Sequence, residues 1–221
     1  SVDGNASRQF DFMLSNPPYG KSWKTDAEKM GGKKEILDSR FNAYLENGEQ
    51  LTMIPRTSDG QLLFLLNNIA KMKKDTELGS RIVEVHNGSS LFTGKAGQGP
   101  SNLRQYILEN DLLEAIVALP EKMFYNTGIG TYLWVLSNKK EKRRKGKVQL
   151  IDATSFKKPL RKNLGEKNCE VDADIRKAIL DLYMAFEDAD SKYSKVFPTS
   201  EFGYWEVPVM RPKRDADGNL V

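Results

Sequence analysis

Short apolar runs and amphipathic segments take turns along most of the chain. The apolar runs have the length and residue types of strands, and the segments between them carry apolar residues at helical spacing. Strand and helix alternate with short connections, which is typical of an α/β fold with a doubly wound sheet. The expected strands are residues 10–14, 81–86, 113–119, 131–136 and 148–151, and the expected helices follow residues 58–60, follow residues 100–101 and span residues 171–187.

The first apolar run ends at a tip with unusual chemistry. Asn16 precedes Pro17, so its backbone is held extended and its amide is aimed off the strand end. Pro17 and Pro18 lack N–H groups, so the stretch presents carbonyl oxygens without competing donors. Tyr19 adds a flat ring, and Gly20 lets the chain turn away. Acceptors beside an aromatic face suit an NH₂ group on a planar ring.

Asn16-Pro17-Pro18-Tyr19 resembles the catalytic tetrapeptide of the amino-methyltransferases, which move a methyl group from S-adenosylmethionine to N6 of adenine in DNA. The resemblance implies that the Asn16 side chain and the Pro17 carbonyl accept the two amine protons, and that Asn16 also belongs to the cofactor site. Tyr19 would stack on a base flipped out of the duplex, with Pro18 completing the tip. Holding both protons moves the nitrogen toward an attacking geometry, so no strong base is needed.

Two other interpretations of the tetrapeptide are a strand that ends in a proline turn and a glutamine methyltransferase acting on release factors, which carries a similar Asn-Pro-Pro-Tyr. The rest of the chain favours DNA, because nearly all of it is similar to the modification (methyltransferase) subunit of bacterial type I restriction-modification systems. Release-factor enzymes share only the tetrapeptide. The similarity is carried by residues 58–60 with the Leu-rich helix that follows, 88–94, 109–120, 124–128, 148–153 and 202–204.

This resemblance implies part of a Rossmann-like, S-adenosylmethionine-dependent methyltransferase fold, with a mixed sheet and flanking helices. The implied partners are DNA and the specificity and restriction subunits. In the family a glycine-rich loop that holds the cofactor lies on an earlier strand, and nothing of that kind precedes Asn16. We therefore expect a piece of a longer subunit that binds S-adenosylmethionine weakly. The alternative is a noncatalytic DNA-associated or assembly module on the same scaffold.

Two expectations about organisation follow from the resemblance. Residues 1–165 are expected to be the C-terminal half of the catalytic domain, and residues 166–221 a helical and extended extension packing on it. Strands that precede the tetrapeptide strand in the family would flank it on one side, so residues 10–14 are expected at an exposed edge. Such an edge favours self-association.

Several other features leave alternatives open. Phe124 is either a second aromatic wall for the flipped base or a hydrophobic plug. The basic run from Lys139 to Lys147 predicts a hairpin with a basic tip, which either touches phosphates or is simply solvated. Residues 21–57, rich in lysine with scattered aromatics, predict a loop that either contacts nucleotides or is solvated. His86 is expected at a loop edge.

Composition restricts the class of protein. The 221 residues are 39% hydrophobic, enough for one packed α/β domain, and the net charge of +4 permits a nucleic-acid partner. Cys169 is the only cysteine and His86 the only histidine, so neither a disulfide framework nor a Cys/His zinc site can be assembled. No apolar stretch reaches the length of a membrane span. These features predict a cytoplasmic protein without a metal centre.

Overall fold

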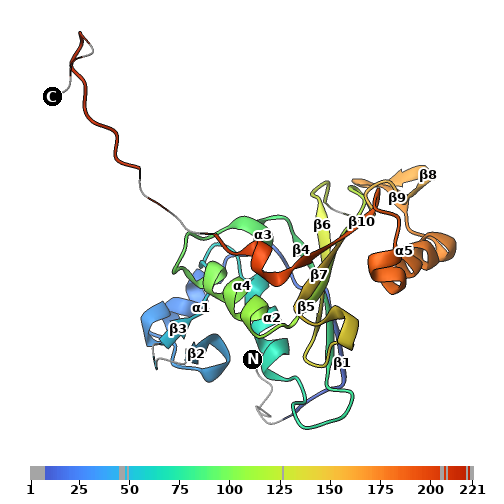
Figure 1. Cartoon of the computed structure of the whole chain (residues 1–221), viewed down its shortest axis with the longest axis horizontal. Coiled ribbons are helices and arrows are strands. Elements are labelled where there is room, and N and C mark those ends of the chain that lie inside the picture. The colour runs from blue at the N-terminus through green and yellow to red at the C-terminus, as the bar shows by residue number, and fades with distance from the viewer. Residues whose placement is uncertain are drawn as a thin grey trace.

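A six-stranded sheet in the order β1-β4-β6-β5-β7-β10 forms the centre of the computed structural model, which describes residues 8–44, 48, 50–125, 127–204, 207, 209–217 and 219 (Figure 1). The strands are β1 Phe12–Ser15, β2 Asn42–Tyr44, β3 Gln50–Thr52, β4 Arg81–Asn87, β5 Leu113–Ala118, β6 Thr131–Ser137, β7 Lys147–Asp152, β8 Lys158–Leu164, β9 Lys167–Glu170 and β10 Ser194–Pro198. The helices are α1 Lys24–Lys29, α2 Gln61–Ala70, α3 Ser89–Phe92, α4 Gly99–Glu109 and α5 Ala173–Ala185, with 3₁₀ turns at Lys33–Glu35, Ser39–Phe41, Lys142–Arg144, Phe186–Asp188 and Thr199–Phe202.

The sheet is mixed, as the resemblance implied. β1 pairs in parallel with β4, and β5 in parallel with β7, while β6 runs antiparallel to both β4 and β5. β10 adds an antiparallel edge to β7. Because β1, β4, β5 and β7 all point the same way, their carboxyl ends meet at one end of the sheet. Side chains that follow these strands therefore share that end.

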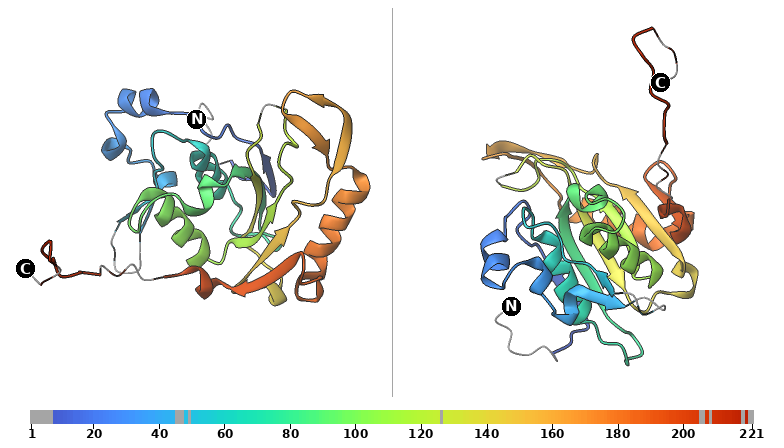
Figure 2. Two further views of the ribbon diagram at one scale, coloured as in Figure 1. Left: turned by 90° about the horizontal axis from the view of Figure 1, so that it is seen from above. Right: turned by 90° about the vertical axis from the view of Figure 1, so that its left-hand side faces the viewer.

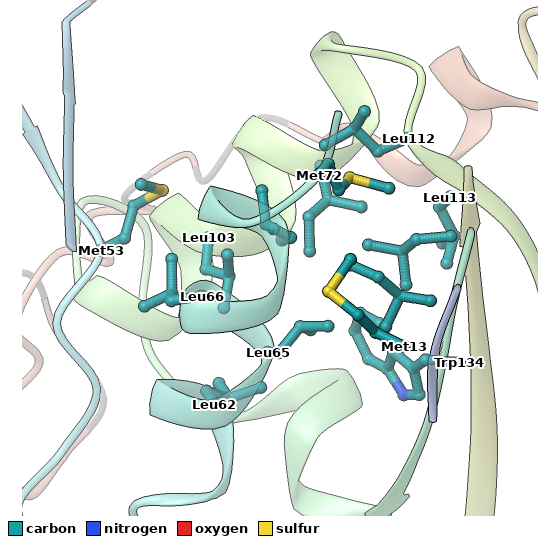
Figure 3. Packing of buried hydrophobic residues seen from close by; sticks show 14 of the residues in the cluster. Met13, Met53, Leu62, Leu65, Leu66, Met72, Leu103, Leu112, Leu113 and Trp134 are labelled. Carbon is teal, nitrogen blue, oxygen red and sulfur yellow. The ribbon is translucent and has the colours of Figure 1, made fainter. Parts of the chain in front are cut away.

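Helices cover both faces of the sheet (Figure 2). α2 and α4 pack on one face, where their leucines and isoleucines meet apolar side chains from the strands in the main hydrophobic cluster. Figure 3 shows this packing, with Leu62, Leu65 and Leu66 of α2 beside Met13 of β1 and Trp134 of β6. α5 covers the other face through a second cluster that includes Val117 and Ile151. The amphipathic patterns of the sequence specify these two layers.

β1 is an edge strand whose two faces differ. Met13 is buried under α2, whereas its neighbours Phe12 and Leu14 point to the opposite face and are 72% and 80% exposed. β1 pairs only with β4 among the described strands. The predicted exposed edge is thus confirmed, although the strand spans Phe12–Ser15 instead of residues 10–14. Self-association through this edge stays a prediction.

The predicted hairpin with a basic tip is wrong. β6 and β7 are not neighbours, because β5 lies between them in the sheet. The connection contains the 3₁₀ turn Lys142–Arg144, and it buries Arg144 and Lys140. Lys140 pairs with Asp111 at 2.5 Å. Several basic side chains of this segment are therefore structural, and the segment lies at the end of the sheet opposite Asn16.

The C-terminal part does not separate cleanly from the sheet. The expected division at residue 165 falls between β8 and β9, which pair as a hairpin, and β10 joins the main sheet. The division into two domains stays a prediction. Beyond the last 3₁₀ turn, the described tail residues 209–217 lead away from the body (Figure 1).

Residues 21–57 fold into α1 and the small sheet of β2 and β3 instead of one long loop. Trp23 is buried and its Nε1–H donates to the Arg56 carbonyl at 2.9 Å. Ala27 and Ile54 complete a third cluster around it. This ring belongs to the core, so it is not available to stack on a nucleotide. Tyr44, 74% exposed, remains at the surface.

Candidate active site

The tetrapeptide directly follows β1, at the end of the sheet where the parallel strands finish. Pro17 is buried and fixes the loop to the body, Tyr19 is half-buried, and Asn16 and Pro18 are exposed. Gly20 has a φ of +70°, a left-handed conformation that favours glycine, and it turns the chain away from the site. The fold therefore holds Asn16 outward beside a partly supported aromatic ring.

The exposed groups of this loop are suited to accepting hydrogen bonds. The Asn16 side chain makes no hydrogen bond to another described residue, and neither Pro17 nor Pro18 has an N–H group. Burial raises the pKa of the Tyr19 phenol above its ordinary value of 10.0, so the ring stays neutral at working pH. A neutral ring next to unpaired acceptors matches a planar amine as substrate.

Each end of the loop is tied down by a side chain far away in sequence. The Ser15 hydroxyl donates to Oε2 of Glu84 at 2.7 Å, and the amide of Asn68 donates to the same oxygen at 2.6 Å. At the other end the Gly20 N–H donates to Oδ1 of Asp59 at 3.1 Å. Sequence reasoning missed these anchors. Of these anchors the sequence pattern singled out only Asp59, which belongs to residues 58–60 before α2.

Phe124 lies in the loop after β5, at the same end of the sheet as the tetrapeptide. β4 and β6 separate β5 from β1 in the sheet. The half-buried ring packs with the second cluster, which includes Val117 and Ile151. These contacts match the alternative in which Phe124 is a hydrophobic plug. The assignment of Phe124 to base stacking stays a prediction without a contact to Tyr19.

His86 does not lie at a loop edge, so that prediction is wrong. The residue is inside β4 and fully buried. Its ring meets Trp134 edge to face, with ring centroids 5.5 Å apart. A lone histidine in a strand that mixes polar and apolar residues carried no signal that could have shown its polar partners.

A broad groove of about 1470 Å³ lies elsewhere, between α4 and the strands β5, β7 and β10. Arg104, Leu150, Tyr193 and Tyr204 are among the residues that line it, and no residue of the tetrapeptide does. The candidate active site is thus an exposed tip at the sheet end and not this groove. Within the described ranges no group of three metal-ligating side chains comes together, and no helix is long and apolar enough to cross a membrane.

An exposed Asn-Pro-Pro-Tyr tip thus follows a parallel strand at the edge of a mixed sheet. The sequence matches the N-6 DNA Methylase family over residues 2–203, and the chain belongs to that family. It is 30% identical over 201 residues to the type I restriction enzyme MjaVII methylase subunit of Methanocaldococcus jannaschii, a match that covers 87% of this chain and 30% of the relative.

Two further comparisons agree. The type I restriction enzyme HindI methylase subunit of Haemophilus influenzae is 45% identical over 148 residues, which cover 66% of this chain and 28% of the relative. The crystal structure of the type I restriction-modification system methyltransferase subunit from Streptococcus thermophilus shares the fold with a TM-score of 0.67 at 21% identity, over 91% of this chain and 37% of that chain. The present chain therefore spans about 30% of the length of the curated relatives that it matches.

Proposed function

We propose that this chain forms the target-base part of an adenine-N6 DNA methyltransferase, the modification subunit of a type I restriction-modification system. The observation that carries the proposal is the exposed Asn16 amide beside Tyr19, on a loop anchored at both ends, in a chain of the N-6 DNA Methylase family. Among the described residues this amide has no hydrogen-bond partner. The family match argues against a glutamine methyltransferase, which the tetrapeptide alone allowed.

The chemistry follows from the acceptors. The adenine amine is a weak nucleophile because its lone pair is delocalised into the ring. The Asn16 side-chain oxygen and the Pro17 carbonyl accept the two amine protons and favour the tetrahedral geometry in which the nitrogen attacks. Tyr19 holds the flipped base by stacking on its ring face. Each residue acts by position and not by donating a proton.

The residues at this end of the sheet fit a methyl-donating cofactor in one respect. The Asn16 amide has no described partner, and β1 pairs with β4 alone among the described strands, so Asn16 can face the cofactor and the base together. S-adenosylmethionine, when bound, supplies an activated methyl group. Asn16 is the residue of this chain that we assign to its site, and further cofactor contacts belong to other parts of the subunit.

The proposed partners are DNA and the specificity and restriction subunits of the complex. The relatives bear the names of type I restriction enzyme methylase subunits. The net charge of +4 is compatible with DNA but weak as evidence, because Lys140 and Arg144 of residues 139–147 are buried beside carboxylates. The noncatalytic alternative differs in one measurable way, since it does not require Asn16.

The test is Asn16→Ala in the complete subunit assembled with its specificity subunit. We expect the rate of N6-adenine methylation to fall more than about a hundredfold, because a transition-state acceptor is lost. DNA affinity should change by less than about threefold, since one exposed amide contributes little to binding a duplex. Tyr19→Phe should stay close to wild type because stacking needs only the ring.

Asn163→Ala is the matched control, because Asn163 is an exposed amide on the β8–β9 hairpin outside the main sheet. It should leave the methylation rate unchanged. Methylation by Asn16→Ala at close to the wild-type rate would remove the tip from the mechanism and support the noncatalytic module.

A further inference from the structure

A buried row of polar side chains lies directly beneath the candidate active site. Glu84 and His86 occupy alternate positions of β4, on the face that α2 covers, and both side chains are fully buried. Gln61, at the start of α2, is 1% exposed. Buried polar groups are costly unless each finds a partner, so their hydrogen bonds can be followed one by one.

The row starts at Ser15, the residue before Asn16. Oε2 of Glu84 accepts from the Ser15 hydroxyl and from the Asn68 amide. Oε1 of the same carboxyl group lies 3.1 Å from Nε2 of His86. The two atoms are not aligned as a full hydrogen bond, and neither has another partner among the described residues. Glu84 thus joins the start of the loop to the imidazole.

The orientation of the Gln61 amide is fixed by its surroundings. Its Oε1 accepts from the backbone N–H of Asn87 at 3.1 Å, and its Nε2 donates to Oδ2 of Asp59 at 2.6 Å. Nδ1 of His86 lies 3.1 Å from Gln61 Oε1 and must therefore donate to it. The histidine tautomer follows from this contact.

The row ends at Gly20, the residue after Tyr19. Asp59 accepts from Gln61 on one oxygen and from the Gly20 N–H on the other. A path of contacts therefore runs from Ser15 through Glu84, His86, Gln61 and Asp59 to the backbone of Gly20. All its links are hydrogen bonds except the 3.1 Å contact between Glu84 and His86.

The contact between Oε1 of Glu84 and Nε2 of His86 is therefore set by position and not by an aligned hydrogen bond. A glutamine at position 84 could keep the shape of this arrangement, since its oxygen would accept from Ser15 and Asn68 and its amide nitrogen would face Nε2 of the imidazole as a donor.

We propose that Glu84, His86 and Gln61 are positioning residues for methyl transfer, which set the placement of Asn16 and Tyr19 by holding both ends of their loop. The inference rests on the proposed function. The side chains of Asn16 and Tyr19 make no hydrogen bond to another described residue, so their placement depends on the loop ends and on the buried Pro17. A displacement of about 1 Å at reacting groups can cost roughly a hundredfold in rate.

The experiment compares Glu84→Met with Glu84→Gln in the complete subunit and its complex. Methionine has a similar length and cannot accept from Ser15, so kcat for methylation should fall at least about tenfold. The dissociation constants for DNA and cofactor should stay within about threefold. Glu84→Gln should recover kcat to within about threefold of wild type. With 2-aminopurine at the target position, Glu84→Met should change the fluorescence of the flipped base and Glu84→Gln should not.

A second variant covers the case in which Glu84→Met fails to fold. Asp59 is half-buried, and Asp59→Asn keeps an oxygen for the Gly20 N–H but places an amide against Nε2 of Gln61. Gln61 cannot turn over, because Asn87 needs its oxygen. The variant should lower kcat about tenfold without loss of DNA affinity.

Three outcomes would overturn the inference: unchanged kcat in both Glu84→Met and Asp59→Asn, equal damage in Glu84→Gln and Glu84→Met, or parallel loss of kcat and DNA affinity. Failure of the proposed function is distinct. It would show as a wild-type complex that does not methylate adenine at N6, or as an Asn16→Ala complex that methylates at close to the wild-type rate. Either result is independent of what the variants of Glu84 do.

Discussion

Glu84 on β4 and Glu114 on β5 are both fully buried, but they lie on opposite faces of the sheet and support different structures. Glu84 faces α2 and accepts from Ser15, at the start of an exposed loop, and from Asn68. Glu114 faces α5, where Oε2 accepts from the Tyr183 hydroxyl at 2.9 Å and lies 3.2 Å from the Arg81 guanidinium. The same residue type therefore serves a surface loop in one place and a helix in the other.

The network around Glu114 is closed on itself. Arg144, 1% exposed, lies between the rings of Tyr183 and Phe186, with centroids 4.1 Å and 4.4 Å from the guanidinium carbon. It also donates to Gln149 at 3.1 Å and to the backbone carbonyl of Tyr183. These contacts fix the C-terminal end of α5 and the turn Lys142–Arg144. No path from them reaches Asn16 through the described side chains.

The contrast shows that burial of a charge does not by itself indicate a functional site. What differs is where the chain of contacts ends. One network ends at Ser15 and Gly20, on the two sides of an exposed motif, whereas the other ends at buried contacts of α5 and at Arg81 of β4. Substitutions in the two networks should consequently separate activity from stability.

The largest expected effect is on stability, from Glu114→Met. Oε1 of Glu114 lies 3.9 Å from Nε of Arg144, so the change leaves this buried guanidinium without its carboxylate. The free energy of unfolding should therefore fall by about 3–5 kcal/mol. Urea denaturation of the variant measures this. Glu141→Gln is the control, because Glu141 is exposed in its pair with Arg143, and its effect should stay within about 0.5 kcal/mol. A loss below about 1 kcal/mol for Glu114→Met would show that the network is not a stabilising unit.

Tyr183→Phe should have an intermediate effect that depends on pH. Burial, and then the negative charge of Glu114, raise the pKa of Tyr183 from 10.0 to about 12. The unfolded chain therefore loses the phenol proton first as pH rises above 10, and the stabilising contribution of Tyr183 disappears as pH approaches 12.

At pH 8 the wild type should be more stable than Tyr183→Phe by about 1.5–3 kcal/mol, the value of a hydrogen bond to a charged group. The difference should shrink between pH 10 and 12. Unfolding curves of both proteins across this range measure it. A difference independent of pH would mean that the phenol is not coupled to folding.

The smallest effect is expected from Lys142→Gln with Lys145→Gln. Both side chains are exposed and lie at the end of the sheet opposite Asn16. Stability should change by less than about 0.5 kcal/mol. DNA affinity and its salt dependence should also be unchanged in the complex. A shallower salt slope would instead show that DNA extends to this end of the sheet.

Much of the fold could be predicted from local patterns. The alternation of apolar and polar residues identified the strands β4, β5 and β6 and the helices α2 and α5, because period and residue type are local properties. The predicted hairpin between β6 and β7 was wrong because strand pairing is not a local property. Adjacency in sequence favoured pairing, but β5, which comes earlier in the chain, lies between the two strands.

The sequence by itself determined the tip, since Asn16, Pro17, Pro18 and Tyr19 carry their chemistry wherever a strand ends. Only the tertiary structure decided which side chains hold that tip in place. Ser15 and Glu84 are 69 positions apart, and Gly20 and Asp59 are 39 apart, so no local pattern could relate them. Parallel pairing of β1 with β4 and the packing of α2 bring these groups together, and a buried polar atom must take the partner that the fold supplies.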